Sequence, residues 1–350
     1  MKSESKMAEQ RIDNKNTLSA SGNGYVVAVD IGGTNLRLAL ADMTGAIVAR
    51  WSSSTAGSRG ADAIIDLICN GVTDLLEKSS VPRSALAAIA AGAPGITDVD
   101  AGIVIATSYL LGWRDVPLRD MLETALGIPA AVDNDVNLAA IGESRAGAAI
   151  GVNDFVFLAI GTGIGAGIVL NGRPFRGMGW SAGEIGYMLV PGVSELPTDH
   201  GKPGALEGLV GGEGIKAEWQ RRWSRERTTL EKHVTATEIF DGALKGDLLA
   251  QIVLEQSARI LAYAIYNMSL MLNCPLFVLG GGVGMHLALE DATRHILKQW
   301  NRHEHMELVR SLLGPDAQLV GAIHLALATA NSHHEKRNCP PRLLRLPHQQ

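Results

Sequence analysis

The chain has 350 residues, of which 46% are hydrophobic and 19% are charged, so it can fill the cores of two domains. Its net charge is −5 and only 5% of its residues are aromatic, which argues against a nucleic-acid-binding protein with a basic surface and stacking platforms. Three widely spaced cysteines suggest no disulfide framework and fit a reducing cytoplasm.

The two ends of the chain are expected to lie outside the folded part. Residues 1–24 are polar and have no apolar core, so they cannot be a secretory signal and should form a disordered segment. Residues 331–350 should form a flexible tail. Between these ends we expect an N-terminal α/β domain at 25–150 and a C-terminal α/β domain at 151–318.

The first informative feature is a glycine-rich turn between two apolar runs. Asp30 ends the first run, and Gly32, Gly33 and Thr34 follow it before the second run starts. Two glycines let backbone N–H groups approach an anion closely, and Thr34 adds a hydroxyl donor. Asp30 is well placed to hold a hydrated Mg²⁺. The alternative interpretation is an ordinary hairpin turn.

The next elements alternate between helices and strands. We expect a helix at 60–78, a buried strand at 86–92, a helix at Pro117–Leu126 with proline in its first turn, and a short strand at 130–132. A further helix should span Val136–Ala146. Asp135 would then lie between a strand and a helix, where its carboxylate could face a cleft and accept a proton. The alternative role of Asp135 is to cap that helix.

Two more glycine-rich turns follow buried strands in the second half of the chain. Gly161, Thr162 and Gly163 partly repeat the first turn, and Gly280–Gly282 follow an apolar run. The repetition predicts a duplicated α/β unit with facing phosphate loops, although three unrelated loops in a chain with 40 glycines remain an alternative.

Three features complete the C-terminal half. Thr235–Glu238 predict a capping box, and 248–272 should be a buried helix rather than a membrane span, because polar residues interrupt it. Residues 317–322 resemble the end of a strand that enters a last helix.

These motifs, in this order, resemble the ROK family (repressors, uncharacterised frames and sugar kinases) of the actin/hexokinase-like superfamily. The resembling segments are Asp30–Arg37, Ala93–Ile96, Val132–Asn137, Gly161–Gly167, Gly183–Gly186 and Gly280–Gly282. The resemblance implies two actin-like (ribonuclease H-like) α/β domains with a cleft between them. It also implies that the last helix, about 319–330, returns to complete the first domain.

The resemblance also implies roles for individual residues. Asp135 would be the catalytic base and Asn134 would bind the sugar. Glu184 and Glu207 would accept hydrogen bonds from sugar hydroxyls, as carboxylates suit a polyol. The residues expected to line the site are, for ATP and its Mg²⁺, Asp30, Gly32, Gly33, Thr34, Arg37, Gly161, Thr162, Gly163, Gly281 and Gly282, and, for the sugar, Asn134, Glu184, Tyr187, Glu207 and Gly95.

The chain departs from the family pattern at the sugar site. Tyr187 stands where many relatives have a histidine that contacts the sugar and binds zinc. Residues 191–207 contain no cysteine, so His200 lacks soft partners and no structural zinc is expected. The segment Tyr109–Trp113 also lacks an asparagine that often precedes Gly-Trp in relatives.

The sequence thus predicts a cytoplasmic, homodimeric enzyme that uses ATP and Mg²⁺ to phosphorylate a hexose, with glucose at the 6-hydroxyl as the default substrate. Mannose, N-acetylglucosamine, N-acetylmannosamine and a polyphosphate donor remain alternatives. A non-catalytic sugar-binding relative is a further alternative. A repressor is disfavoured, since the residues before Tyr25 are too few for a helix-turn-helix domain. No nucleic-acid or membrane partner is expected.

Overall fold

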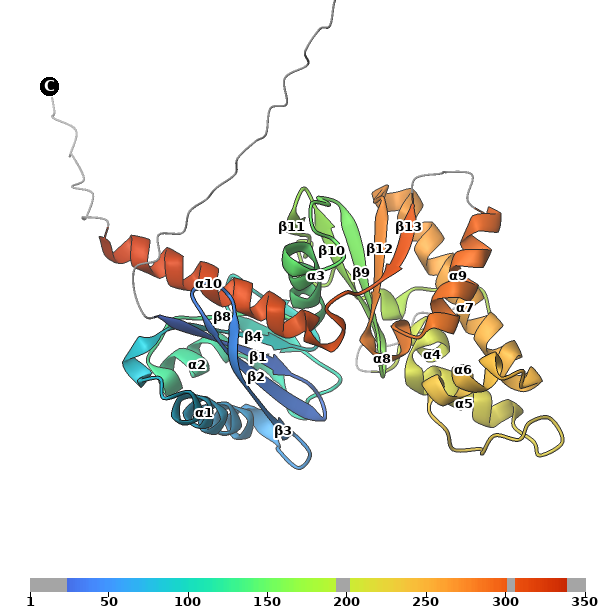
Figure 1. Cartoon of the computed structure of the whole chain (residues 1–350), viewed down its shortest axis with the longest axis horizontal. Coiled ribbons are helices and arrows are strands. Elements are labelled where there is room, and N and C mark those ends of the chain that lie inside the picture. Colours follow the sequence, from blue (N-terminus) through green and yellow to red (C-terminus); the bar gives the residue numbers. More distant parts are fainter. Residues whose placement is uncertain (1–23, 193–201, 301–305, 339–350) are drawn as a thin grey trace, which may run out of the picture.

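The computed structural model describes residues 24–192, 202–300 and 306–338, which form two lobes (Figure 1). The strands are β1 (Tyr25–Ile31), β2 (Asn35–Asp42), β3 (Ile47–Ser54), β4 (Leu86–Ala93), β5 (Ile96–Asp98), β6 (Ile103–Ala106), β7 (Arg114–Val116), β8 (Ala130–Asn134), β9 (Phe155–Ile160), β10 (Ile164–Leu170), β11 (Arg173–Pro174), β12 (Leu276–Gly280) and β13 (Glu307–Arg310). The α-helices are α1 (Gly60–Ser79), α2 (Leu118–Leu126), α3 (Asp135–Ala146), α4 (Glu207–Val210), α5 (Gly212–Arg222), α6 (Ala236–Leu244), α7 (Leu248–Leu272), α8 (Gly281–Gly284), α9 (Leu287–Trp300) and α10 (Ala317–Asn338).

Each lobe is built on a five-stranded mixed sheet. The first sheet has the order β3-β2-β1-β4-β8, and the second has the order β11-β10-β9-β12-β13. In both sheets the first three strands pair antiparallel and the last two join in parallel. This shared plan confirms the expected α/β fold and matches the repeat that the glycine turns suggested.

Helices cover both faces of the first sheet. Apolar side chains of β1, β2 and β4 alternate between a core with α1 and α2 and a second core with α10 and α3. Helix α3 also packs on β9 and β10 of the second sheet, so it lies between the lobes. Helix α7 is long and apolar enough to span a membrane, yet 56% of its most apolar window is buried and it packs in the core of the second lobe.

The last helix corrects one expectation. Residues 317–322 are helical throughout, as the first turns of α10, and the strand of this region is β13, which ends at Arg310. The apolar Leu319 and Ile323 pack on β1 and β4 of the first lobe. Helix α10 continues to Asn338, so helical structure extends into the segment 331–350 that we expected to be a flexible tail.

Candidate active site

Asn134, not Asp135, caps helix α3. The Asn134 Oδ1 accepts the backbone N–H groups of Val136 at 2.9 Å and Asn137 at 3.0 Å. Its Nδ2 donates to the carbonyl of Gly95 at 2.9 Å, which leaves one amide hydrogen for a ligand. The capping role considered for Asp135 therefore belongs to its neighbour, and the Asp135 carboxylate stands in the first turn of the helix.

The surroundings of Asp135 favour a proton acceptor that works near neutral pH. Burial raises the pKa of the Asp135 carboxyl to about 7, with further contributions from the negative charges of Asp30 and Glu184. A hydrogen bond from the Val136 N–H opposes the increase. A base with a pKa near the working pH is well matched to proton abstraction from a hydroxyl.

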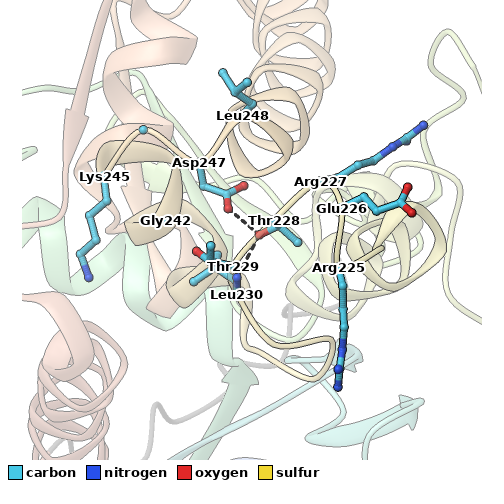
Figure 2. Close-up of a pocket in the computed structure, with 11 residues that line it drawn as sticks. Arg225, Glu226, Arg227, Thr228, Thr229, Leu230, Gly242, Lys245, Asp247 and Leu248 are labelled. Carbon is cyan, nitrogen blue, oxygen red and sulfur yellow. Dashed lines mark hydrogen bonds between the residues drawn. The ribbon is translucent and has the colours of Figure 1, made fainter.

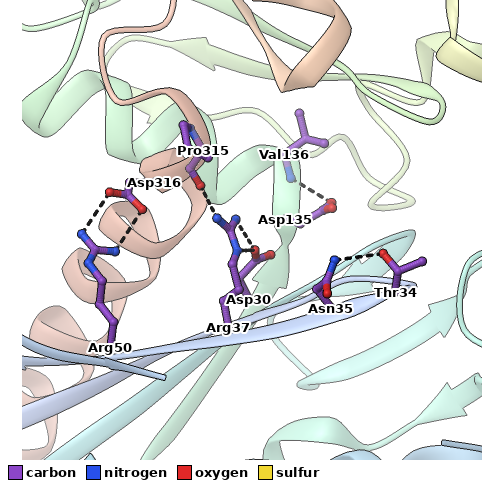
Figure 3. A network of polar contacts seen from close by, with 9 residues as sticks. All are labelled: Asp30, Thr34, Asn35, Arg37, Arg50, Asp135, Val136, Pro315 and Asp316. Carbon is purple, nitrogen blue, oxygen red and sulfur yellow. Dashed lines mark hydrogen bonds and ion pairs between the residues drawn. The ribbon is translucent and has the colours of Figure 1, made fainter. Parts of the chain in front are cut away.

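Asp30 is held by a network that reaches the start of α10 (Figure 3). Arg37, its cross-strand neighbour, donates to Asp30 Oδ2 through Nε at 2.9 Å and also through a terminal nitrogen. The other terminal nitrogen of Arg37 donates to the Pro315 carbonyl at 2.6 Å. Next to it, Arg50 and Asp316 form a bidentate pair with both distances at 2.9 Å. The guanidinium of Arg37 therefore fixes Asp30 and ties the β1–β2 hairpin to the final helix.

The first glycine turn is exposed at its tip. The Gly32 N–H donates to the carbonyl of Asn35 at 2.8 Å, which closes the turn. Gly33 and Thr34 are exposed, and the Thr34 hydroxyl accepts a hydrogen bond from Asn35 Nδ2 at 3.2 Å. Gly33 and Thr34 are therefore the exposed residues of this turn, whereas the Gly32 N–H is used within it.

The second glycine turn lies against the segment that carries Glu207. The Gly161 N–H donates to the Gly163 carbonyl at 3.0 Å, and the Gly161 carbonyl accepts from Gly212 at the start of α5 at 2.8 Å. A Cβ on Gly163 would lie 2.0 Å from Glu207 Oε2, so a larger residue there would displace the Glu207 carboxylate. A Cβ on Gly161 would meet no heavy atom within 4 Å.

The third glycine cluster adjoins the second turn. Gly281 has φ +78°, and a Cβ there would lie 2.4 Å from the carbonyl of Ile160, which directly precedes Gly161 and Thr162. Gly282, by contrast, has open space at its Cβ position. The two glycine segments expected to bind one nucleotide thus lie side by side.

The residues expected at the sugar site come from two neighbouring segments. Glu184 and Tyr187 belong to a short 3₁₀ turn at 185–187 and its N-cap, and Glu207 opens α4. A Cβ on Gly186 would lie 3.4 Å from Glu207 Cβ, so the segments are in contact. Glu207 Oε2 also accepts a hydrogen bond from the Tyr109 hydroxyl at 2.9 Å, although Tyr109 comes from the first lobe.

A buried ion pair connects this region to the strand that leads into Asp135. Arg176, which follows β11, donates through Nε to Asp133 Oδ1 at 3.1 Å, and its terminal nitrogen pairs with Oδ2. The Asp133 side chain is 1% exposed and also accepts the N–H of Asn134 at 2.8 Å. The carbonyl of Arg176 accepts from Ala182, which holds the segment leading to Glu184. Sequence reasoning noted the segment Tyr109–Trp113 only for its missing asparagine and gave Arg176 no role, because no motif marks a contact between distant segments.

A hollow of about 440 Å³ on the second lobe lies between the loop 225–230 and the turn joining α6 to α7. Figure 2 shows that Arg225, Arg227 and Lys245 point in different directions instead of converging on one point. Asp247 is used internally, since it caps α7 through Ala250. The hollow therefore lacks a converged set of groups for a ligand.

Comparison with known proteins identifies the family. The sequence model of the ROK family matches residues 26–329. This chain belongs to the ROK family. It is 33% identical to a glucokinase of Halalkalibacterium halodurans, over 88% of this chain and 96% of that protein. It is 30% identical to an N-acetylmannosamine kinase of Shigella flexneri, over 86% and 98% respectively.

Two solved ROK structures share the fold. A glucokinase from Streptomyces griseus, crystallised with glucose and AMPPNP, has 28% identity and a TM-score of 0.73, covering 87% of this chain and 99% of that one. A ROK transcriptional regulator, a homologue of the E. coli MLC protein, has 23% identity and a TM-score of 0.76, covering 88% and 79%. The likeness to the glucokinase identifies the actin-like fold of ROK kinases. The likeness to the transcriptional regulator concerns the fold alone.

The zinc motif of many ROK proteins can be compared only in part. Among the described residues, no group of three or more His, Cys, Asp or Glu side chains is arranged to hold a metal ion. His200 lies outside the described residues, as do residues 193–199. The expected absence of structural zinc therefore stays a prediction.

Proposed function

We propose that this protein is an ATP-dependent sugar kinase that transfers the γ-phosphate of ATP to a hexose, with glucose at its 6-hydroxyl as the substrate. The observation that carries the proposal is the Asp135 carboxyl. It stands in the first turn of α3, near Asp30 and Glu184, with its pKa raised to about 7. ROK relatives that include a glucokinase support the reaction class.

In the proposed reaction the sugar hydroxyl gives its proton to Asp135, and the oxygen attacks the γ-phosphorus while the bond to the β-phosphate oxygen breaks. Gly33 and Thr34 would hold the transferred phosphate, and Gly161–Gly163 the remaining phosphates. Gly281 and Gly282 would adjoin the adenosine. Domain closure would exclude water and limit wasteful hydrolysis of ATP.

Asp30 suits a hydrated Mg²⁺, because this hard cation takes carboxylate oxygens and retains several waters. Both hydrogen bonds that Arg37 donates to Asp30 end on Oδ2, so among the described residues no hydrogen-bond donor reaches Oδ1. When bound, the ion neutralises charge on the phosphates. Arg37 keeps the Asp30 carboxylate in place for that contact.

For the sugar we propose that the Glu184 and Glu207 carboxylates accept hydroxyl hydrogen bonds, while Asn134 Nδ2 donates its remaining hydrogen. N-acetylmannosamine is the second candidate substrate, because an N-acetylmannosamine kinase is also a full-length relative. Tyr187, in place of a histidine, is the residue at which the choice between hexoses would differ from that of relatives. We place the enzyme in the cytoplasm, where ATP is available.

The test is a panel of sugars assayed with ATP and with polyphosphate, with the phosphorylated position identified by NMR. We expect ATP-dependent phosphorylation of glucose, and at most slow turnover of N-acetylmannosamine. Preferential turnover of another sugar would keep the kinase and change its substrate. Sugar binding by calorimetry without phosphorylation from either donor would instead identify a non-catalytic sugar-binding ROK relative.

A further inference from the structure

Tyr109 links the two lobes at the proposed sugar site. It lies between β6 and β7 of the first lobe, and its hydroxyl donates to Oε2 of Glu207 in the second lobe at 2.9 Å. The same oxygen accepts the backbone N–H of Ile164 at 3.2 Å. Among the described residues, no other donor reaches Glu207, so this phenol supplies one of its two hydrogen bonds.

The segment that carries Tyr109 is fixed to the first lobe, whereas its own side chain is not. Leu110 and Trp113 are 7% and 4% exposed and belong to the core of that lobe. Tyr109 itself is 42% exposed. Rotation about its side-chain bonds can therefore release Glu207 without unfolding the loop.

The phenol also lies between the two glycine turns. A Cβ on Gly33 would lie 3.1 Å from the Tyr109 carbonyl oxygen, and a Cβ on Gly163 would lie 2.3 Å from its hydroxyl oxygen. Burial of the hydroxyl end, followed by the charge of Glu207 and then those of Asp135 and Glu184, raises the pKa of the phenol. The hydroxyl therefore stays protonated and occupies space where the proposed reaction brings the sugar and the phosphate together.

We propose that Tyr109 is a specificity-determining residue whose hydroxyl occupies a sugar-binding oxygen of Glu207 in the empty enzyme and yields it to a sugar hydroxyl. This inference rests on the proposed function, which gives Glu207 a sugar hydroxyl as its ligand. When a sugar with a hydroxyl facing Glu207 binds, that hydroxyl replaces the Tyr109 hydroxyl as the donor to Oε2. The affinity for that sugar is consequently lowered by the bond to Tyr109 that must break.

A sugar that lacks the hydroxyl facing Glu207 does not compete with Tyr109 for Oε2. Tyr109 can then keep its bond to Glu207, so the carboxylate does not lose a donor when the sugar excludes water. Without the phenol, the same sugar would leave Glu207 poorly satisfied, which is unfavourable for a carboxylate removed from water. Tyr109 therefore narrows the difference in affinity between the complete sugar and this single deoxy analogue.

The substitution Tyr109→Phe separates these effects, because it keeps the ring and removes the hydroxyl. Dissociation constants would be measured by calorimetry for the preferred hexose and its monodeoxy analogues. We expect the variant to bind the complete sugar about threefold to tenfold more tightly, the worth of one net hydrogen bond. For one analogue, the one that lacks the hydroxyl facing Glu207, the affinity should stay unchanged or fall.

Tyr263→Phe is the matched control, since Tyr263 stacks on Trp300 in the second lobe with ring centroids 4.7 Å apart, away from the site. Weaker binding of every sugar by the Tyr109→Phe variant would show that the phenol is itself a sugar ligand and overturn the proposal. An equal change for all sugars, or none, would overturn it as well. Failure of the wild-type protein to bind or phosphorylate any sugar would refute the proposed function itself, a distinct result.

Discussion

Replacing Asp135 by asparagine tests the candidate site through turnover and stability together. The amide has nearly the shape of the carboxylate, so the first turn of α3 and the cap supplied by Asn134 should persist. It cannot accept the proton of a sugar hydroxyl as a base. We expect kcat to fall by about 10²–10⁴-fold, the usual contribution of a positioned general base, with little change in sugar affinity.

The same substitution should stabilise the protein, because the wild-type site holds a negative charge where burial disfavours it. The ordinary pKa of this side chain is 3.8 and its pKa in the fold is about 7. That difference corresponds to at most about 4 kcal/mol above pH 7. Asp135 retains partial solvent access, which screens the charge, so we expect about 1–2 kcal/mol.

The sign of the effect follows from proton linkage. Because the folded pKa lies above the unfolded one, the contribution of Asp135 to stability is complete below about pH 4 and is lost as the pH rises to about 7. The variant has no such loss. The Tm difference between variant and wild type should therefore be near zero at pH 4 and reach a plateau above pH 7. Near-normal turnover of the Asp135→Asn variant, or a Tm difference that does not change with pH, would refute this account of Asp135.

Four further changes test the remaining parts of the site. Gly161→Ala should leave the fold intact, because its Cβ position is open, yet raise the KM for ATP if a phosphate lies there; an unchanged KM would remove this turn from the nucleotide site. Arg176→Met should lower the unfolding free energy in urea by about 3–5 kcal/mol, since it leaves Asp133 buried and unpaired, and the double variant with Asp133→Asn should recover part of the loss. Tyr187→His should re-rank hexoses that differ at C1 or C2, as judged by kcat/KM, whereas Tyr187→Phe with an unchanged ranking would indicate a packing role. Chelation should abolish turnover and Mg²⁺ should restore it, while elemental analysis should find less than one zinc per chain.

The helices could be predicted where the local sequence signals and the pattern of apolar residues indicate the same element. The capping box at Thr235 opens α6, and the apolar stretch 248–272 is a helix with those same bounds. Near the C-terminus the sequence did not distinguish a strand from a helix. Leu319, Val320 and Ala322 are apolar neighbours that suit a strand or a buried helix equally, and only packing on β1 and β4 decides for the helix. Pro117 was expected within the helix but is its N-cap, a difference of one residue.

The candidate site was predictable to the extent that its residues sit in motifs. The sequence placed Asp135 at the junction of a strand and a helix, but it could not decide between a base and a cap. That choice depends on Asn134, whose side chain has the geometry to reach two backbone N–H groups and so takes the capping role. From the sequence, only Asp135 was considered as the cap, although asparagine and aspartate are equally favoured at this position.

Contacts between distant segments join the two parts of the candidate site, and no local pattern encodes them. Tyr109 and Glu207 are 98 positions apart, and Arg176 and Asp133 are 43 apart. Both pairs join a first-lobe segment to the part of the second lobe that carries the proposed sugar ligands. Arg176 pairs with the buried Asp133 and should keep the two segments together. Tyr109 is 42% exposed, so its side chain can rotate away from Glu207. If the proposed roles hold, the region combines a fixed link near Asp135 with a releasable one at Glu207. A binding site that must admit a ligand and then align it with Asp135 needs both.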